Sequence, residues 1–144
     1  MGLRGRLQGL APQSTKSRLL LGRESLRDAT LADTERLPAP LDARVRHVVS
    51  ENARVRQAVA ALRAGDLHEV GRLLDASHAS LRDDFDVSVP EVEETVSLLR
   101  GVGAAGARMM GGGFGGSVLA LLPPGVRPPA RALPVLPAGA ARLL

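Results

Sequence analysis

The apolar residues of this chain follow a regular pattern only from Leu41 onward. From there, one face of a helix is marked by positions that recur every three or four residues: Val45, Val48, Val49, Asn52, Val55, Val59 and Leu62. Pro40 precedes this stretch, Asp42 is a candidate N-cap, and Gly65 is a candidate end. The pattern predicts a long amphipathic helix whose arginines lie on its solvated face.

A second helix is predicted directly after Gly65. Asp66 is its candidate N-cap, with Glu69 three residues later as in a capping box. Its apolar stripe is Leu67, Val70, Leu74, Ser77 or His78, and Leu81. Because only a tight turn at Gly65 separates them, the first two helices should form an antiparallel hairpin.

A third helix is predicted between Ser88 and Gly101. Ser88 and Glu91 form an S-x-x-E capping box around Pro90, and acidic residues in the first turn favour a helix N-terminus. The residues expected to face inward are Val92, Val96 and Leu99.

The pattern then changes from helical to extended. Residues 104–110 and 117–122 are short segments suited to strands. They are separated by a glycine-rich loop: Gly111, Gly112, Gly113, Phe114, Gly115 and Gly116. The predicted fold class is α+β, with helices packed on a small antiparallel sheet that contains this glycine-rich hairpin.

The two ends of the chain lack such patterns. Residues 1–18 are expected to form an irregular lead. Residues 123–144 form a proline-rich tail, which excludes a helix and permits at most a short edge strand near Leu133–Leu136.

Composition excludes several classes of site. The 144 residues include no Cys, Trp or Tyr and only two Phe, so the core must be aliphatic, and disulfides, thiolate metal sites and cysteine nucleophiles are absent. Three His leave little for a metal site. The net charge of +4 comes from arginines scattered among acidic residues without interleaved aromatics, so we expect no nucleic-acid partner.

No membrane segment is expected either. The uncharged stretch 109–126 is interrupted by glycines and prolines, and its dense apolar run, Val118–Leu122, has the length of a strand. The first residues lack the pattern of a signal peptide. We therefore expect a cytoplasmic protein.

The glycine loop allows two interpretations. It can be a flexible turn between strands, or a loop whose backbone N–H groups converge on an anion or let a ligand approach the main chain. Arg108 could add a charge-assisted contact to a phosphate, and Phe114 is expected to pin the loop to the core. The loop also matches the pattern G-x-G-x-x-G of dinucleotide-binding loops. That pattern requires a helix directly after the glycines, whereas a strand is predicted here.

Three segments, and a shorter fourth one, resemble galactokinases of the GHMP small-molecule kinase family. RMMGGGFGGS (108–117) is similar to their third sequence motif, and RHVVSENARV (46–55) to the segment around R-H-x-x-x-E-N. SHASLRDDF (77–85), followed by VSVPE (87–91), matches a further segment, as does SLRDAT (25–30). The resemblance covers about residues 19–122 and implies a GHMP kinase C-terminal domain.

The family transfers the γ-phosphoryl group of ATP to the anomeric hydroxyl of galactose with Mg²⁺. Its sugar-binding motif, serine-rich phosphate loop and catalytic aspartate precede the matched region, a galactose-contacting tyrosine is absent, and Met110 stands at a usual threonine. The resemblance therefore implies a C-terminal fragment, inactive alone, that is either a truncated gene product or one half of a split enzyme. The partners in the complete enzyme are galactose and ATP, and a split enzyme would add a separately encoded N-terminal half. The alternatives are a non-catalytic sugar- or nucleotide-binding or regulatory module and, more weakly, a kinase for another sugar.

The candidate site consists of the loop Gly111–Gly116, with Arg108, Ser117 and His78 as supporting residues. No catalytic residue and no metal ligand is assigned. The favoured interpretation of His78 is a core or interface histidine, and His47 and His68 are expected in solvent. Aspartates that could suggest a cation site are expected to end the second helix and cap the segment after it: Asp83, Asp84 and Asp86.

Overall fold

The computed structural model describes residues 13–135. Its helices and strands follow one another in this order: a helical segment at residues 13–20, η1 (Leu26–Asp28), α2 (Leu31–Thr34), α3 (Leu41–Ala64), α4 (Leu67–Asp83), α5 (Pro90–Gly101), β1 (Gly106–Met109) and β2 (Val118–Leu121). Helices α4 and α5 pack on a two-stranded antiparallel sheet, which confirms the predicted fold class. Residues 13–18 are helical where we expected an irregular lead.

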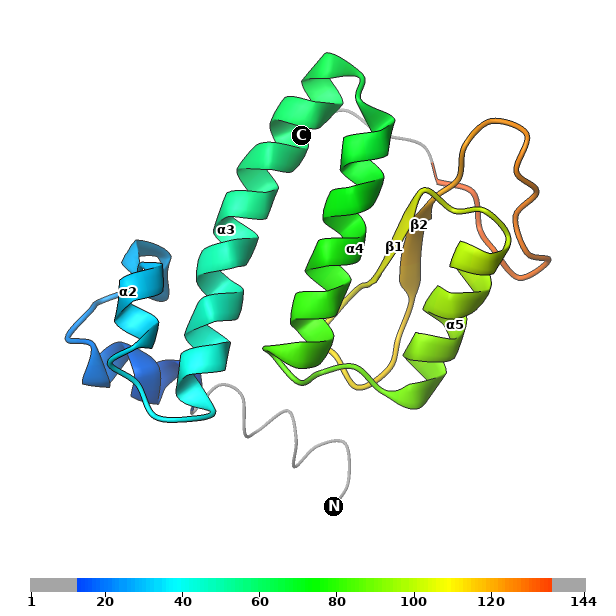
Figure 1. Cartoon of the computed structure of the whole chain (residues 1–144). Coiled ribbons are helices and arrows are strands. Elements are labelled where there is room, and N and C mark those ends of the chain that lie inside the picture. Colours follow the sequence, from blue (N-terminus) through cyan, green and yellow to red (C-terminus); the bar gives the residue numbers. More distant parts are fainter. Residues whose placement is uncertain (1–12, 136–144) are drawn as a thin grey trace, which may run out of the picture.

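Helices α3 and α4 form the predicted hairpin and lie side by side (Figure 1). Gly65 adopts the left-handed conformation that ends α3, with φ of 71°, and Asp66 caps α4 by accepting a hydrogen bond from the Glu69 N–H. The prediction that Asp42 caps α3 is wrong, because α3 begins one residue earlier and Pro40 occupies the N-cap position.

Helix α5 begins at Pro90 and ends at Gly101, and Val92, Val96 and Leu99 are buried as predicted. The predicted capping box is wrong. Val89 is the N-cap residue, and the Ser88 hydroxyl instead donates to Oε1 of Glu93 at 2.5 Å. Proline in the first turn leaves one fewer backbone N–H to be capped, so the helix starts without a side-chain cap.

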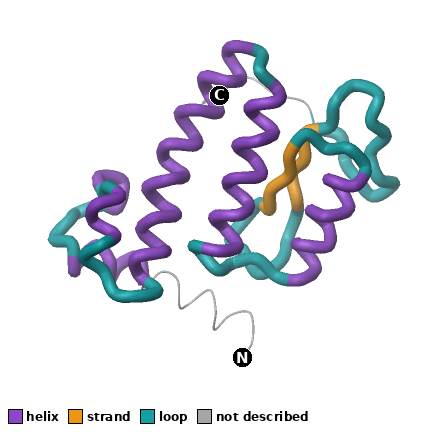
Figure 2. Tube along the Cα trace, viewed as in Figure 1, coloured by secondary structure: helices purple, strands orange, loops and turns teal. Residues whose placement is uncertain are grey.

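The two strands pair antiparallel with Arg108 opposite Leu119, and the glycine-rich loop joins them (Figure 2). The Met110 N–H donates to the Ser117 carbonyl at 2.8 Å and closes the hairpin. The tail contains no helix or strand between residues 123 and 135, and the rest of the predicted edge-strand region lies outside the described residues.

Helix α4 covers the outer edge of β1. The Ala107 N–H donates to Oδ1 of Asp75 at 2.9 Å, and the Met109 N–H donates to Nδ1 of His78 at 3.4 Å. The helix can approach this closely because Gly71 and Gly106 meet at the contact, where a Cβ on Gly106 would overlap the Gly71 carbonyl. Side chains of α4 thus occupy the place of a third strand.

The main core lies between α4, α5 and the sheet and is aliphatic apart from Phe114. Its buried residues are Leu81, Val87, Val92, Val96, Leu99, Ala107, Met109 and Phe114. A second cluster packs the N-terminal segment against the start of α3: Leu21, Ala29, Leu37, Leu41 and Val45.

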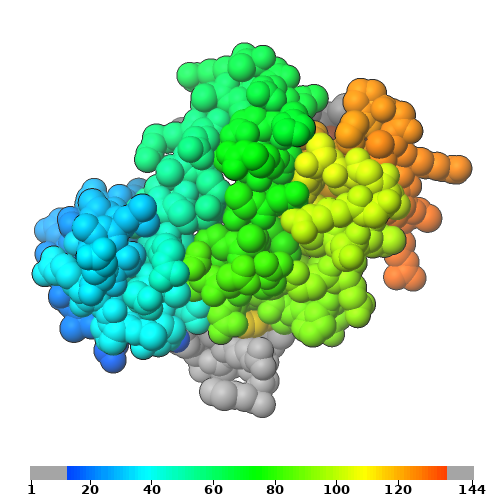
Figure 3. Space-filling view, in the orientation of Figure 1, coloured from blue at the N-terminus to red at the C-terminus, as the bar shows by residue number. Residues whose placement is uncertain are grey.

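The second half of α3 stands clear of the N-terminal segment, as Figure 3 also shows for this face of the molecule. Of the predicted apolar stripe, only Val45 is fully buried, whereas Val55, Val59 and Leu62 are exposed. On α4, Leu67 of the predicted apolar stripe is exposed, whereas Leu73, which is not on that stripe, is buried. In the part of the chain that the structure describes, no helix combines the length and the apolar character needed to cross a membrane.

Candidate functional site

The glycine loop is built from residues in conformations that favour glycine. Positive φ angles occur at Gly111, Gly113, Gly115 and Gly116, and also at Phe114. The Phe114 N–H donates to the Val87 carbonyl at 2.7 Å, and the Phe114 side chain is buried in the main core. The expected role of Phe114 as the pin of the loop is confirmed.

The loop is tightly fitted on one side and open on the other. A Cβ on Gly113 would lie 2.5 Å from the Val87 Cβ, so glycine is required there by space as well as by φ. At Gly111, in contrast, nothing lies within 4 Å of such a Cβ. The exposed residues of the loop are Gly111, Gly112, Gly116 and Ser117. Their main chain is accessible to a ligand on the outer side of the loop.

Arg108 does not turn toward the exposed side of the loop. Its Nε donates to the Met109 carbonyl at 3.1 Å, and its Nη1 lies 3.5 Å from Oε2 of Glu51 on α3. The guanidinium therefore links the strand before the loop to α3. Its proposed contact with a phosphate stays a prediction.

His78 is fully buried, as the core interpretation predicted. Its Nδ1 accepts from the Met109 N–H, and its Nε2 lies 3.0 Å from Oε1 of Glu93. Burial opposes ionisation of Glu93, yet hydrogen bonds from the Ser88 hydroxyl and from Arg82, together with the charge of Arg82, hold its pKa below the usual value. The imidazole joins α4, β1 and α5, which makes it a positioning residue at the base of the loop.

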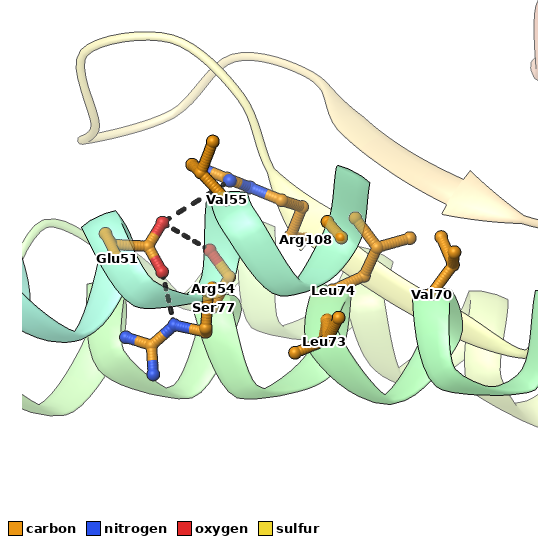
Figure 4. Close-up of a pocket in the computed structure, with 9 residues that line it drawn as sticks. Glu51, Arg54, Val55, Val70, Leu73, Leu74, Ser77 and Arg108 are labelled. Carbon is orange, nitrogen blue, oxygen red and sulfur yellow. Dashed lines mark hydrogen bonds and ion pairs between the residues drawn. The ribbon is translucent and has the colours of Figure 1, made fainter. Parts of the chain in front are cut away.

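A shallow hollow of about 80 Å³ lies between α3 and α4, beside Arg108 (Figure 4). Its apolar lining residues are Val55, Ala58, Val70, Leu73 and Leu74. Its polar lining residues form one cluster: Glu51, Arg54, Ser77 and Arg108. Glu51 is the centre of the cluster, accepting from Arg54 Nε at 2.5 Å and from the Ser77 hydroxyl at 2.7 Å.

This cluster favours the ionised form of the Glu51 carboxyl. Burial raises the pKa of its carboxyl, but hydrogen bonds from Ser77 and Arg54 and the charges of Arg54 and Arg108 outweigh burial and lower the pKa. The sequence analysis assigned Glu51 no role. The signal that could have found it is the pairing of the 46–55 segment with 77–85, both of which carry the family resemblance.

The first turns of α3 hold a second polar contact with α4. His47, expected in solvent, is buried, stacks on Phe85 with ring centroids 4.5 Å apart, and has Nδ1 2.9 Å from the Ser80 hydroxyl. Since that hydroxyl donates to Asp84 at 3.0 Å, Nδ1–H of His47 is assigned as the donor to it. Desolvation is the main reason that the pKa of His47 is lowered, which favours the neutral ring.

Arg44 is also buried instead of solvated. Its Nη1 donates to the Asp84 carbonyl at 2.5 Å, and its Nη2 lies 3.4 Å from Oδ2 of Asp86. The aspartates at the end of α4 are also paired with arginines, Asp83 with Arg82 and the C-cap residue Asp84 with Arg46. Across residues 13–135 no group of three His, Asp or Glu side chains could hold a metal ion.

Comparison with known proteins identifies the class of protein to which this fold and loop belong. Residues 58–132 match the family model described as GHMP kinases C terminal. The chain therefore belongs to the GHMP kinase family, as the sequence motifs indicated.

The particular relatives are galactokinases. The chain is 50% identical over 102 residues to the galactokinase of Thermotoga petrophila and 48% identical over 103 residues to that of Thermotoga neapolitana. Among solved structures it is similar to Lactococcus lactis galactokinase complexed with galactose, with a TM-score of 0.70 and 32% identity over 85% of this chain. The chain spans 29% of the length of the Thermotoga enzymes and 34% of the Lactococcus chain.

Proposed function

We propose that this chain acts as the C-terminal domain of a galactokinase, which transfers the γ-phosphoryl group of ATP to the anomeric hydroxyl of galactose. The observation that carries the proposal is the pinned glycine loop, whose exposed main chain lies within residues 58–132, the region that matches the C-terminal family model. In this role the loop Gly111–Gly116 forms one wall of the substrate and nucleotide site, with Ser117 at its end. The same relatives favour the kinase over a non-catalytic sugar- or nucleotide-binding module.

Two features of the glycine loop support the proposal: the loop is held in place, and its outer side carries no side chains. Phosphoryl transfer depends on positioning and on stabilisation of charge, so a wall that contacts the nucleotide has to be held in place. Phe114 and Val87 hold the inner side of the loop, and the glycines leave its outer side free of side chains. Backbone amides at such positions fit a phosphate oxygen, which supports ATP as the ligand of this wall.

The described residues do not fit a Mg²⁺ site. Two acidic residues that reach the strand before the loop, through His78 and Arg108, are engaged: Glu93 with His78 and Ser88, and Glu51 with Arg54 and Ser77. Within the described part of the chain, residues 13–135, no group of three His, Asp or Glu side chains is placed to hold a metal ion. We therefore assign no catalytic or metal-binding role to this chain. The phosphate loop, the base and the Mg²⁺ ligands belong, in this proposal, to a cytoplasmic polypeptide that supplies the rest of the enzyme, encoded together with this chain or separately.

The test compares the 144-residue chain with a fusion in which it replaces the matched C-terminal part of the Thermotoga petrophila enzyme. Galactose 1-phosphate formation from galactose and ATP is measured for both. We expect the fusion to turn over and the isolated chain to give none. Turnover by the isolated chain, or a well-folded fusion without activity, would contradict the proposal.

A matched pair of substitutions tests the loop itself. Gly111→Ala and Gly125→Ala introduce the same methyl group at exposed glycines with φ of 90° and 86°, and neither methyl meets an atom within 4 Å. In the fusion, Gly111→Ala should lower kcat/KM for ATP by roughly tenfold to a hundredfold. Gly125→Ala, in the tail, should leave kcat/KM unchanged. Equal effects of the two substitutions on kcat/KM would show that the loop is not part of the site.

A further inference from the structure

The glycine loop rests on the segment that joins α4 to α5. Val87 of this segment is buried, its carbonyl accepts from the Phe114 N–H, and its Cβ leaves no room for a side chain at Gly113. The Val87 N–H donates to the carbonyl of Leu81, in the last turn of α4, at 3.1 Å. The position of the loop therefore depends on how firmly residues 84–87 are held.

Residues 84–87 form no regular helix or strand, and Asp86 has a φ of 59°, a conformation that few residues other than glycine adopt. Such a segment keeps a single conformation only where its surroundings determine it. Backbone hydrogen bonds to α4 supply part of that support, since the Phe85 N–H donates to the Ser80 carbonyl at 2.9 Å. Side chains from the first turns of α3 supply the rest.

The buried guanidinium of Arg44 holds the residues on both sides of Phe85. Its Nη1 donates to the Asp84 carbonyl at 2.5 Å, and its Nη2 lies 3.4 Å from Oδ2 of Asp86. The third donor, Nε, is used by Oε1 of Gln13 at 3.0 Å. Because the guanidinium is planar and its donors are fixed relative to one another, it sets the distance between the groups that it binds.

Arg46 contacts the same segment in a different way. It pairs with the carboxylates of Asp84 and Asp42, and its side chain is 44% exposed, whereas that of Arg44 is 9% exposed. Exposed ion pairs contribute little, but a buried main-chain carbonyl that loses its donor costs free energy. Of these two arginines, Arg44 is therefore the one that fixes the main chain.

We propose that Arg44 is a positioning residue for the phosphorylation of galactose. By holding the Asp84 carbonyl it fixes Val87, and through Val87 it fixes the main chain of Phe114 and hence the glycine loop. This inference rests on the proposed function, in which that loop is a wall of the nucleotide site. Its structural part, the coupling of Arg44 to the loop, is measurable without any activity.

Amide hydrogen exchange on the 144-residue chain tests this coupling. Arg44→Gln should speed exchange of the Phe114 amide by at least about tenfold more than exchange of the Ala107 amide. The Ala107 N–H donates to Asp75 on α4 and reports opening of the hairpin as a whole. Arg46→Gln is the matched control and should change the ratio of the two rates by less than about threefold.

A second control separates positioning from a loss of global stability. Asp33 is a buried carboxylate whose partners, Arg23, Thr30 and Arg36, all belong to the N-terminal segment. Asp33→Asn should therefore leave the ratio of the Phe114 and Ala107 rates unchanged. Equal acceleration of both amides by Arg44→Gln, or none at Phe114, would overturn the inference.

A conservative variant keeps the test available if Arg44→Gln does not fold. Arg44→Lys retains the positive charge but has one nitrogen where two now reach Asp84 and Asp86. It should accelerate Phe114 exchange over Ala107 exchange by a smaller factor, about threefold. An unchanged ratio in Arg44→Lys would overturn the inference as well.

Steady-state kinetics of the fusion with the Thermotoga petrophila sequence test the consequence for the reaction. Arg44→Gln should lower kcat/KM for ATP by roughly tenfold and leave the KM for galactose unchanged, because the loop faces the nucleotide. Arg46→Gln should change neither constant. A galactose KM that rises as much as the KM for ATP would show a general loss of structure and would overturn the positioning role.

The remaining outcomes separate this inference from the proposed function. If Gly111→Ala lowers kcat/KM for ATP and Arg44→Gln does not, Arg44 is no positioning residue and the proposed function stands. A parent fusion without activity contradicts the proposed function alone. The exchange rates of the 144-residue chain then decide whether Arg44 positions the loop.

Discussion

Helix α4 lies between two interfaces of opposite character. Toward β1 and α5 the contact is close and mainly apolar, with Gly71 against Gly106 and an aliphatic core beside them, and its polar contacts come from Asp75 and His78. We call this the dry interface. Toward α3 the contact is polar, and it runs from His47 and Ser80 to Glu51 and Ser77, with the shallow hollow beyond. The first interface fixes the hairpin that carries the glycine loop, and the second attaches a long helix whose outer half is exposed.

This difference determines what each interface tolerates. A close-packed contact between backbones has no space for an added atom, and loss of buried apolar volume leaves a cavity. The polar contact is buried at His47, Ser77 and Ser80, but around Glu51 the side chains are 17% to 31% exposed. Water can therefore reach the groups that remain there when charge pairing is lost. The dry interface should therefore be the more sensitive to substitution, and the polar one the more sensitive to pH.

The largest effect is expected at the glycine contact. Gly106→Ala places a methyl group on the Gly71 carbonyl, and since both partners are backbone, α4 has to move away from β1. Equilibrium urea unfolding should show a loss of more than about 3 kcal/mol. Gly101→Ala, at the end of α5 where nothing lies within 4 Å, is the control and should be neutral or slightly stabilising. Equal stability of the two variants would contradict the close contact.

Two neighbouring methionines test how tightly the same interface is packed. Met109 is 1% exposed in the main core, and the next residue, Met110, is 47% exposed. Met109→Ala should lower the free energy of unfolding by about 2 to 3 kcal/mol because it leaves a cavity. Met110→Ala should change it by less than about 0.5 kcal/mol. A small effect at Met109 would mean that the core is loosely packed.

The polar interface should respond less. Glu51→Gln keeps the size of the side chain but removes the charge that pairs with Arg54 and Arg108. We expect a loss of about 1 to 2 kcal/mol in urea unfolding. Glu94→Gln, on the exposed side of α5, is the matched control and should stay within about 0.5 kcal/mol. A loss at Glu51 as large as that of Gly106→Ala would erase the distinction between the two interfaces.

The sequence predicted the parts of this arrangement that local rules control. The turn at Gly65 and Asp66, the inward face of α5 and the hairpin around the glycines follow from periodicity and from residues with special backbone preferences. The strands are shorter than predicted by one to two residues at each end, although Ala105 N–H and Met110 N–H still donate to carbonyls of the partner segment. The loop was found because glycine runs are visible without a structure.

The features that sequence reasoning missed depend on contacts between distant segments. Arg44 and His47 look like solvated helix residues until α4 lies beside them, since charged and polar side chains are buried only when a specific partner is present. Gly71 looks like a weak helix residue, and only its contact with Gly106 gives a reason for it. The exposed second half of α3 breaks the rule that an apolar stripe faces a core within the described residues.

His47 gives the smallest predicted effect and the one that depends on pH. Burial lowers its pKa below the ordinary value of 6.5, so the unfolded chain binds the proton more readily than the folded chain. Its contribution to stability is complete above pH 6.5 and is lost as pH falls through the lowered pKa of the folded state. Urea unfolding at about pH 7.5 and about pH 5.5 should therefore show the protein less stable at the lower pH. His47→Gln should reduce this difference, whereas His68→Gln, at an exposed position of α4, should preserve it. A pH difference unchanged by His47→Gln would place the titrating group elsewhere and would leave the polar interface without its expected sensitivity to acid.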